Sequence, residues 1–174
     1  MSKKVIWLIN QYVTRYSDSG GTRHLDFASE WVKKGYEVHT VLINTGGFDE
    51  AELAAIEERA YDLGSAQHAN LTIVEKYYDK AIKYLIYGNV LKNNTYPLSV
   101  SAERVFQAIE AIKYAKSVGA EAIAHGSTGA GNDQIRFDLI FQTLLLFVFF
   151  YSQNLKSRWL HLWHCYLFPY QIFL

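Results

Sequence analysis

Short apolar runs alternate along the chain with longer segments in which apolar residues recur every three or four positions. The apolar runs are typical of strands buried on both faces. They cover residues 4–10, 36–43, 70–74 and 121–124. The amphipathic segments predict helices. These are expected at residues 23–34, from Asp49 to about Leu63, at 77–87, at 101–118 and from Asp133 onward.

The alternation of strands with helices predicts an α/β fold with an open parallel sheet of the Rossmann-like type. In such sheets ligands bind on the loops that follow the carboxyl ends of the strands. Two loops that contain glycine occupy that position, at residues 19–21 and 126–131. We therefore expect any binding site to lie on these loops.

Length and charge narrow the possible functions. The chain has 174 residues and a mass of 20.0 kDa, the size of one domain. Its 17 basic residues balance its 17 acidic ones, which argues against a general nucleic-acid or polybasic membrane binder. Cys165 is the single cysteine, so an intramolecular disulfide is excluded. The first ten residues form neither a secretory signal nor a membrane span, which predicts a cytoplasmic protein.

The composition changes near residue 143. No acidic residue follows that position, and the last 32 positions are rich in aromatic and aliphatic side chains, with charges at Lys156 and Arg158. We predict a nucleotide-binding α/β domain at 1–142 and an atypical aromatic-rich tail at 143–174. The tail has three interpretations: a buried strand or helix end, an anchor on a membrane surface, or an out-of-frame continuation that follows a truncation.

The second glycine-containing loop is the strongest candidate for a binding site. Its three glycines allow the backbone to approach a ligand closely, and successive N–H groups can hold phosphate oxygens. The loop has neither the Walker pattern nor the dinucleotide pattern, so a simple chain reversal is the alternative. Polar and charged side chains nearby favour binding. They are Thr128, Asn132, Asp133, Gln134 and Arg136.

A further candidate is the segment YPLSVS at residues 96–101. Tyr96 and Ser101 could orient a small polar ligand, or the segment could be a turn followed by a helix N-cap. The six histidines show no spacing typical of metal ligands, so no metal site is expected.

From residue 35 to about residue 142 the chain resembles argininosuccinate synthase. The stretches that carry the resemblance are GYEVHTVLINTGGFDEAELAAIEERAYDLG, YLIYGNVLKNNTYPLSVSAER and, most specific of the three, AHGSTGAGNDQIRFDL. The resemblance implies a sheet of the adenine nucleotide alpha-hydrolase type, incomplete at its C-terminal end. It also implies an ATP-dependent ligase of arginine biosynthesis that joins citrulline to aspartate through a citrullyl-adenylate.

The resemblance assigns binding residues but no catalytic nucleophile. ATP would contact the two glycine-containing loops, at Ser19, Gly20, Gly21, Gly126, Ser127, Thr128, Gly129, Gly131 and Asn132. Citrulline would contact Tyr96, Ser101, Asn132 and Arg136. Aspartate would contact Thr128, Asn132 and Asp133. Mg²⁺ would accompany the nucleotide, and the protein would align the reactants and stabilise developing phosphate charge.

Two segments depart from the family pattern. Residues 5–32 resemble the start of a GT-B glycosyltransferase, and the family's S-G-G-L-D-T-S loop retains only Ser-Gly-Gly at 19–21, followed by Thr-Arg-His-Leu. The family pattern also stops after residue 142. We therefore expect a fragment that is inactive alone and does not form the family's oligomer. The alternatives are a glycosyltransferase domain fused to unrelated sequence and a truncated domain without catalysis.

Overall fold

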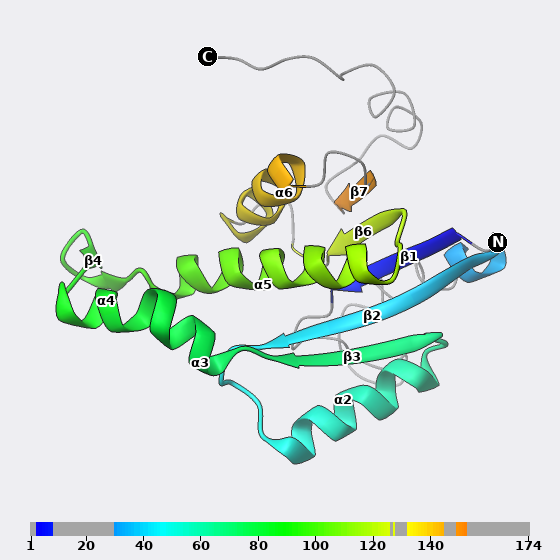
Figure 1. Cartoon of the computed structure of the whole chain (residues 1–174), viewed down its shortest axis with the longest axis horizontal. Helices are drawn as coiled ribbons and strands as arrows, with labels where there is room; N and C mark the ends of the chain where they lie inside the picture. Colours follow the sequence, from blue (N-terminus) through cyan, green and yellow to red (C-terminus); the bar gives the residue numbers. More distant parts are fainter. Residues whose placement is uncertain (1–2, 9–29, 126, 128–131, 145–148, 153–174) are drawn as a thin grey trace.

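The computed structural model describes residues 3–8, 30–125, 127, 132–144 and 149–152. Within them a five-stranded parallel sheet has the order β3-β2-β1-β6-β7 (Figure 1). Its strands are β1 (Lys3–Leu8), β2 (Tyr36–Asn44), β3 (Gln67–Thr72), β6 (Ala122–His125) and β7 (Phe149–Ser152). The predicted open parallel sheet is confirmed. The strand order reverses direction between β1 and β6, which is where such folds bind ligands.

Strand β2 lies inside the sheet, between β1 and β3. The apolar side chains of Val38, Val41, Leu42 and Ile43 suit this position, and residues 38–44 are all buried. Val38 pairs with Val5 of β1, and Val41 pairs with Ala69 of β3. The strand ends at Asn44, so the chain leaves the sheet at its carboxyl edge with Thr45.

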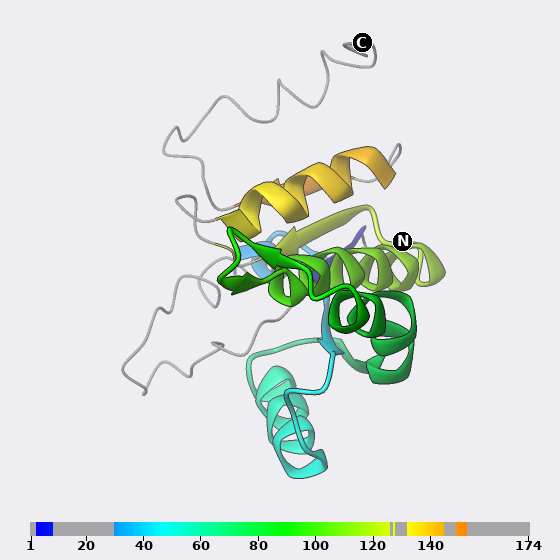
Figure 2. The same ribbon diagram turned by 90° about the vertical axis from the view of Figure 1, so that its left-hand side faces the viewer.

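Helices cover both faces of the sheet. Val41 and Ile43 of β2 pack in the core with Ala111 and Ile112 of α5 (Ser99–Ser117). On β3, the Asn70 side chain instead donates to Leu53 O of α2 (Glu50–Asp62), and Asn70 pairs with Leu42, which lies between Val41 and Ile43 on β2. Because side chains alternate between the faces of a strand, α2 and α5 lie on opposite faces. Figure 2 shows α2 on one side of the strands, with α5 and α6 (Asn132–Leu144) on the other.

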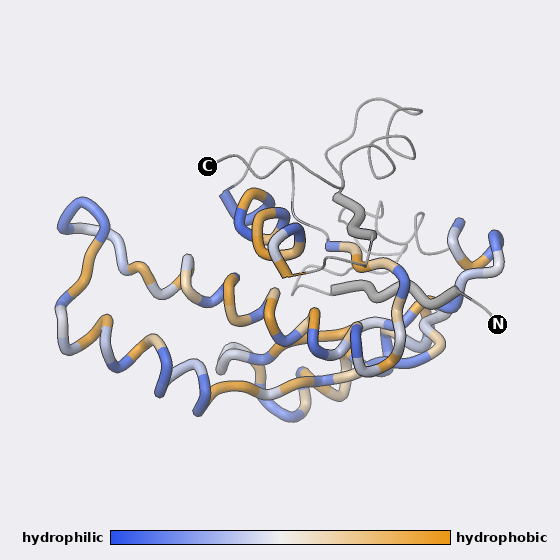
Figure 3. The backbone as a smooth tube through the Cα atoms, turned by 45° about the horizontal axis from the view of Figure 1, so that its top comes forward, coloured by the Kyte–Doolittle hydropathy of each residue, from blue (hydrophilic) through white to orange (hydrophobic). Residues whose placement is uncertain are grey.

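Small side chains let α5 approach the sheet. Ala108, Ala111 and Ala115 are fully buried, and Phe137 and Phe141 of α6 join the same core. In Figure 3 hydrophobic positions recur along α5 and α6, separated by hydrophilic ones. The predicted start of α2 is also confirmed, because Asp49 caps it and Glu52 completes a capping box.

The connection from β3 to α5 is more structured than the sequence predicts. The expected helix at 77–87 begins earlier, as α3 (Val74–Tyr77), and continues through a π-helical segment η1 (Tyr78–Ile82) into α4 (Lys83–Tyr87). The expected loop at 88–97 contains a short antiparallel hairpin, β4 (Leu91–Lys92) and β5 (Tyr96–Pro97). Asn93 and Asn94 both have positive φ, as tight hairpin turns require.

Two predicted boundaries are wrong. The strand expected at 70–74 lies at 67–72, because hydrogen bonds satisfy the polar side chains of His68 and Asn70 within the sheet. Ser101 does not cap α5. The helix starts at Ser99 with Leu98 as N-cap, so Ser101 lies within its first turn. Nothing after Pro97 breaks a helix, which allows this earlier start.

Part of the tail segment belongs to the sheet, and its first two residues are the end of α6. Residues 149–152 form β7, which pairs in parallel with β6. The strand interpretation therefore applies to these four residues, while 145–148 and 153–174 lie outside the described residues. The domain boundary at residue 142 stays a prediction. No helix in the described part of the chain is long and apolar enough to cross a membrane.

Candidate functional site

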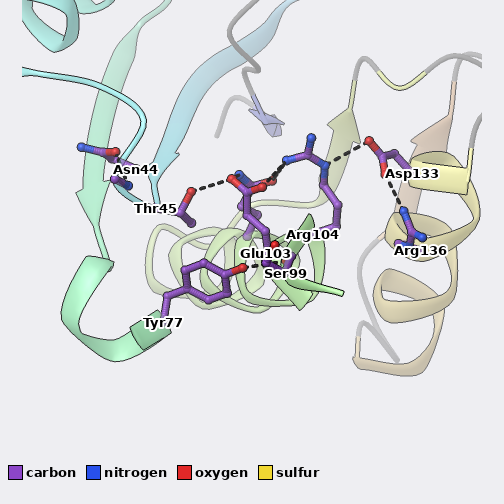
Figure 4. Close-up of polar contacts among 10 residues, drawn as sticks. Asn44, Thr45, Tyr77, Ser99, Glu103, Arg104, Asp133 and Arg136 are labelled. Atoms are coloured by element: carbon purple, nitrogen blue, oxygen red, sulfur yellow. Dashed lines mark hydrogen bonds and ion pairs between the residues drawn. The ribbon is translucent and has the colours of Figure 1, made fainter. Parts of the chain in front are cut away.

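Polar side chains from three separate segments meet at the carboxyl edge of the sheet (Figure 4). Thr45 follows β2, Glu103 and Arg104 lie in the first two turns of α5, and Asp133 and Arg136 lie in the first two turns of α6. We call these five residues the edge cluster. Hydrogen bonds and ion pairs connect all five.

Glu103 joins the exit of β2 to α5. Thr45 Oγ1 donates to Glu103 Oε1 at 2.5 Å, and Gln107 Nε2 donates to the same oxygen at 3.2 Å. The turn that contains Thr45 is fixed by Asn44, which accepts from Gly46 N–H at 2.9 Å and donates to Phe48 O at 3.2 Å. The Glu103 carboxylate is therefore held from two sides.

Arg104 joins α5 to α6. Its Nε donates to Asp133 Oδ2 at 3.0 Å, and its Nη1 lies 3.1 Å from Gln107 Oε1 and 3.3 Å from Glu103 Oε2. The side chain is 24% exposed, so solvent weakens these contacts less than it weakens those of a surface pair. The planar guanidinium suits several acceptors in one plane.

Asp133 lies between two guanidinium groups. Its Oδ1 accepts from Arg136 Nη1 at 2.7 Å, while its Oδ2 accepts from Arg104. The carboxylate also lies in the first turn of α6, where the helix dipole favours negative charge. Two guanidinium groups share this one carboxylate. Because Glu103 also pairs with Arg104, the two acidic and two basic side chains of the edge cluster balance in formal charge.

A buried histidine stands at the end of β6. His125 is 2% exposed, and its ring lies against Phe137 and Phe141. Its Nε2 lies 2.9 Å from Asp138 Oδ1, and its Nδ1 lies 3.4 Å from the N–H of Ser127. The backbone N–H can only donate. Nδ1 therefore accepts, and Nε2 carries the proton toward Asp138.

Tyr77 supports the start of α5 from below the cluster. Its hydroxyl donates to Ser99 O at 2.6 Å, and its ring packs edge-on against Phe106. Burial, with the nearby Glu103 carboxylate as a second cause, raises the pKa of Tyr77 to about 12. The hydroxyl therefore stays protonated and keeps its donor role at neutral pH.

The structure brings together some of the predicted site residues. Asp133 and Arg136 meet directly, and Ser127 contacts His125 beside the loop. Tyr96, which is 52% exposed on the hairpin, Ser101 and Asn132 have no hydrogen bond or ion pair with the edge cluster among the described residues. Some predicted ATP and aspartate residues lie outside the described residues. These are Ser19, Gly20, Gly21, Gly126, Thr128, Gly129 and Gly131.

Several residues of the site were missed by sequence reasoning. Glu103 and Arg104 stand two and three residues after Ser101, inside a stretch that carries the family resemblance, so their charge beside a proposed ligand loop was an available signal. Thr45 and the pair His125–Asp138 had no local signal. Their roles depend on contacts with segments 58 and 13 residues away.

The strand order and the charged cluster at the carboxyl edge define an open α/β domain of the Rossmann-like class. The family model described as "Arginosuccinate synthase N-terminal HUP domain" matches residues 16–147. The chain therefore belongs to the argininosuccinate synthase N-terminal domain family. This match includes residues 16–32, which overlap the segment predicted to be glycosyltransferase-like, and that second resemblance stays a prediction.

Curated relatives agree with the family assignment. The argininosuccinate synthase of Saccharolobus solfataricus is 40% identical over 116 residues, which cover 66% of this chain and 29% of the relative. That of Xylella fastidiosa is 42% identical over 107 residues, covering 62% of this chain and 26% of the relative. The chain thus spans less than a third of the length of the relatives it matches.

Among solved structures, a predicted subunit of tRNA methyltransferase from Methanocaldococcus jannaschii aligns with 94% of this chain and 73% of its own. The TM-score is 0.48 at 20% sequence identity, and this likeness carries no argument about function.

Proposed function

We propose that this chain provides the ATP-binding and amino-acid-binding part of an argininosuccinate synthase, an enzyme of cytoplasmic arginine biosynthesis. The observation that carries the proposal is the Asp133–Arg136 pair at the start of α6. It stands directly after the glycine-rich loop, at the edge of the sheet where this fold class binds ligands. A charged pair there complements the opposite charges of an α-amino acid.

ATP fits the glycine-rich loop between β6 and α6. The strand ends at the buried His125, and α6 begins at the exposed Asn132, so its N-terminal dipole faces the loop. Among the described residues no group of three or more His, Cys, Asp or Glu could hold a metal ion. We therefore propose that Mg²⁺ arrives on the phosphates of ATP, which is its usual mode of binding.

The two amino-acid substrates are those that the family resemblance implies, and the charges at the start of α6 support the assignment. We assign aspartate to Thr128, Asn132 and Asp133, and citrulline to Tyr96, Ser101, Asn132 and Arg136. The Asp133 carboxylate suits an ammonium group, and the Arg136 guanidinium suits a carboxylate. Tyr96 and Asn132 are exposed, so both are accessible to a ligand.

The proposed reaction needs positioning and no covalent intermediate on the protein. The ureido oxygen of citrulline attacks the α-phosphorus of ATP, and pyrophosphate leaves. The aspartate amine then attacks the ureido carbon, AMP leaves, and the amine loses a proton. The chain's own groups would align the two amino acids and balance charge. Because the chain spans less than a third of its relatives, we propose that it binds these ligands without completing the reaction.

Calorimetric titration of the full chain with Mg-ATP, citrulline and aspartate tests the proposal. We expect saturable binding that weakens for citrulline in Arg136→Ala. The matched control is Lys113→Ala, which removes an exposed cation from the outer side of α5 and should bind as the wild type does. A folded chain that binds none of the three ligands would contradict the proposal. Binding of a nucleotide sugar without ATP binding would favour the glycosyltransferase alternative.

A further inference from the structure

We propose that Arg104 is a positioning residue of the amino-acid site. It holds the Asp133 carboxylate in one orientation and thereby leaves Arg136 available to a ligand. This inference rests on the proposed function, because it assigns a task to a residue that contacts Asp133, one of the proposed ligand-binding side chains. Arg104 comes from α5, whereas Asp133 and Arg136 come from α6 (Figure 4).

Two guanidinium groups share the Asp133 carboxylate. Arg104 Nε holds Oδ2 at 3.0 Å, and Arg136 Nη1 holds Oδ1 at 2.7 Å. Rotation of the carboxylate about its last bond would break both charge-assisted contacts. The two guanidinium groups therefore fix the plane of the carboxylate from opposite sides.

Arg104 is itself held in place by neighbouring side chains on α5. Its Nη1 contacts Gln107 at 3.1 Å and Glu103 at 3.3 Å. Glu103 in turn accepts a hydrogen bond from the Thr45 hydroxyl at 2.5 Å. The orientation of Asp133 is thus connected to the exit of β2 through side chains on α5. Lysine could not reproduce this arrangement, because its ammonium is a point donor without a planar fork.

The contact between Arg104 and Asp133 determines how Asp133 can pair with Arg136. Asp133 and Arg136 are three residues apart on one helix, so without Arg104 both carboxylate oxygens could turn toward the Arg136 guanidinium. A bidentate pair of this kind would neutralise Arg136 and compete with a ligand carboxylate. By retaining one oxygen, Arg104 limits Asp133 to a single contact with Arg136. The site is then already oriented for an ammonium and a carboxylate, which lowers the cost of binding.

The test compares amino-acid affinity with nucleotide affinity in the full chain. Arg104→Ala should weaken the binding of L-aspartate and L-citrulline by about tenfold or more, the loss expected for one charge-assisted hydrogen bond. Arg104→Lys should restore only part of this loss. The affinity for Mg-ATP should stay at the wild-type value in both variants, whereas a general loss of folding would lower all three affinities. Lys113→Ala on the same helix is the matched control.

Unchanged amino-acid affinity in Arg104→Ala would overturn the inference. An equal loss of ATP affinity in a variant whose circular dichroism spectrum matches that of the wild type would overturn it as well. A double-mutant cycle separates this failure from that of the proposed function. Thermal unfolding of Arg104→Ala, Asp133→Asn and the double variant should show non-additive losses, because the two side chains are in contact. If the wild type binds no amino acid, the proposed function fails. The double-mutant cycle then tests by itself whether Arg104 holds Asp133. Additive losses of thermal stability would show that it does not.

Discussion

His125 Nε2 lies 2.9 Å from Asp138 Oδ1, a contact that joins the last residue of β6 to the second turn of α6. The same carboxylate accepts from Gln134 Nε2 at 3.1 Å, and the other ring nitrogen of His125 accepts from the N–H of Ser127. The two sides of the glycine-rich loop are therefore connected through one buried imidazole. The geometry of the loop ends depends on this ring.

Replacing His125 should destabilise the domain. We expect His125→Ala to lower the free energy of unfolding by about 2–4 kcal/mol, because it leaves a cavity beside Phe137 and Phe141 and removes the donor to Asp138. His125→Gln keeps a side-chain N–H donor and should lose less. Urea denaturation measures both. Equal losses would show that packing alone accounts for the effect of this side chain.

Acid should destabilise the chain through His68. This side chain contacts Thr40 Oγ1 at 2.8 Å and Asn70 Oδ1 at 3.0 Å, and burial lowers its pKa below the ordinary 6.5 even though the Asn70 contact acts in the opposite direction. The unfolded chain therefore takes up a proton at higher pH than the folded one. Stability should be complete above pH 6.5 and should fall as the pH drops from 6.5 toward the lower folded value.

The melting temperature, measured between pH 8 and pH 5, tests this prediction. His68→Gln serves as the control, since it cannot titrate and its amide can keep one of the two polar contacts. The acid-dependent decrease should be smaller in this variant than in the wild type. An unchanged decrease would assign the effect to other groups.

Removing the hydroxyl of Tyr77 should weaken the support of α5. Tyr77→Phe keeps the ring contact with Phe106 but loses the donor to Ser99 O, which should cost about 1 kcal/mol. Tyr78→Phe is the matched control, because the neighbouring side chain is 47% exposed. Urea unfolding at neutral pH compares the two variants. Similar small losses would contradict a supporting role for Tyr77.

Tyr77 should also make the stability of the chain depend on pH in the alkaline range. The pKa of Tyr77 is about 12 in the folded chain, above its ordinary value of 10.0, so the unfolded state loses this proton first. The contribution of Tyr77 to stability should therefore decrease as the pH rises from 10 toward 12. Tyr77→Phe should lack that part of the decrease in an alkaline thermal-unfolding series. An identical decrease in the variant would contradict the assignment.

Two C-terminal deletions should behave differently. A chain that ends at Gln142 loses β7 and the last residues of α6, and the edge of β6 becomes unpaired where Ala122 and His125 face Phe149 and Ser152. We expect this chain to melt at a lower temperature than one that ends at Ser152. Circular dichroism during heating measures the difference. Equal melting temperatures would show that β7 adds no stability.

Solubility should improve when the chain is shortened to Ser152, after β7. Residues 153–174 carry many aromatic and aliphatic side chains and two formal charges, Lys156 and Arg158. Removing them while keeping β7 should raise the soluble concentration, because it removes aggregation-prone sequence. A chain that ends at Ser152 but is less soluble than the full chain would contradict this expectation.

Local patterns were sufficient for much of the fold. The apolar runs located β1, β2 and β6 to within a few residues, and the helix expected from Asp49 begins with Asp49 as its N-cap. These features depend on nearest neighbours, since burial on both faces demands apolar side chains and a capping carboxylate acts within its own turn. Predictions failed where distant segments satisfied polar groups. At β3, His68 obtains its partner from Thr40, 28 residues away.

The sequence by itself determined the alternation of strands and helices, the glycine-rich loop and the charges at Asp133 and Arg136 that follow it. Only the tertiary structure decided that Arg104, 29 residues before Asp133, holds its carboxylate, and that Thr45 is connected to the same cluster. The physical reason is the topology. Parallel strands place their carboxyl ends, and the helix starts that follow, at one edge of the sheet. Segments far apart in the chain therefore meet there, and no local pattern records which side chains will touch.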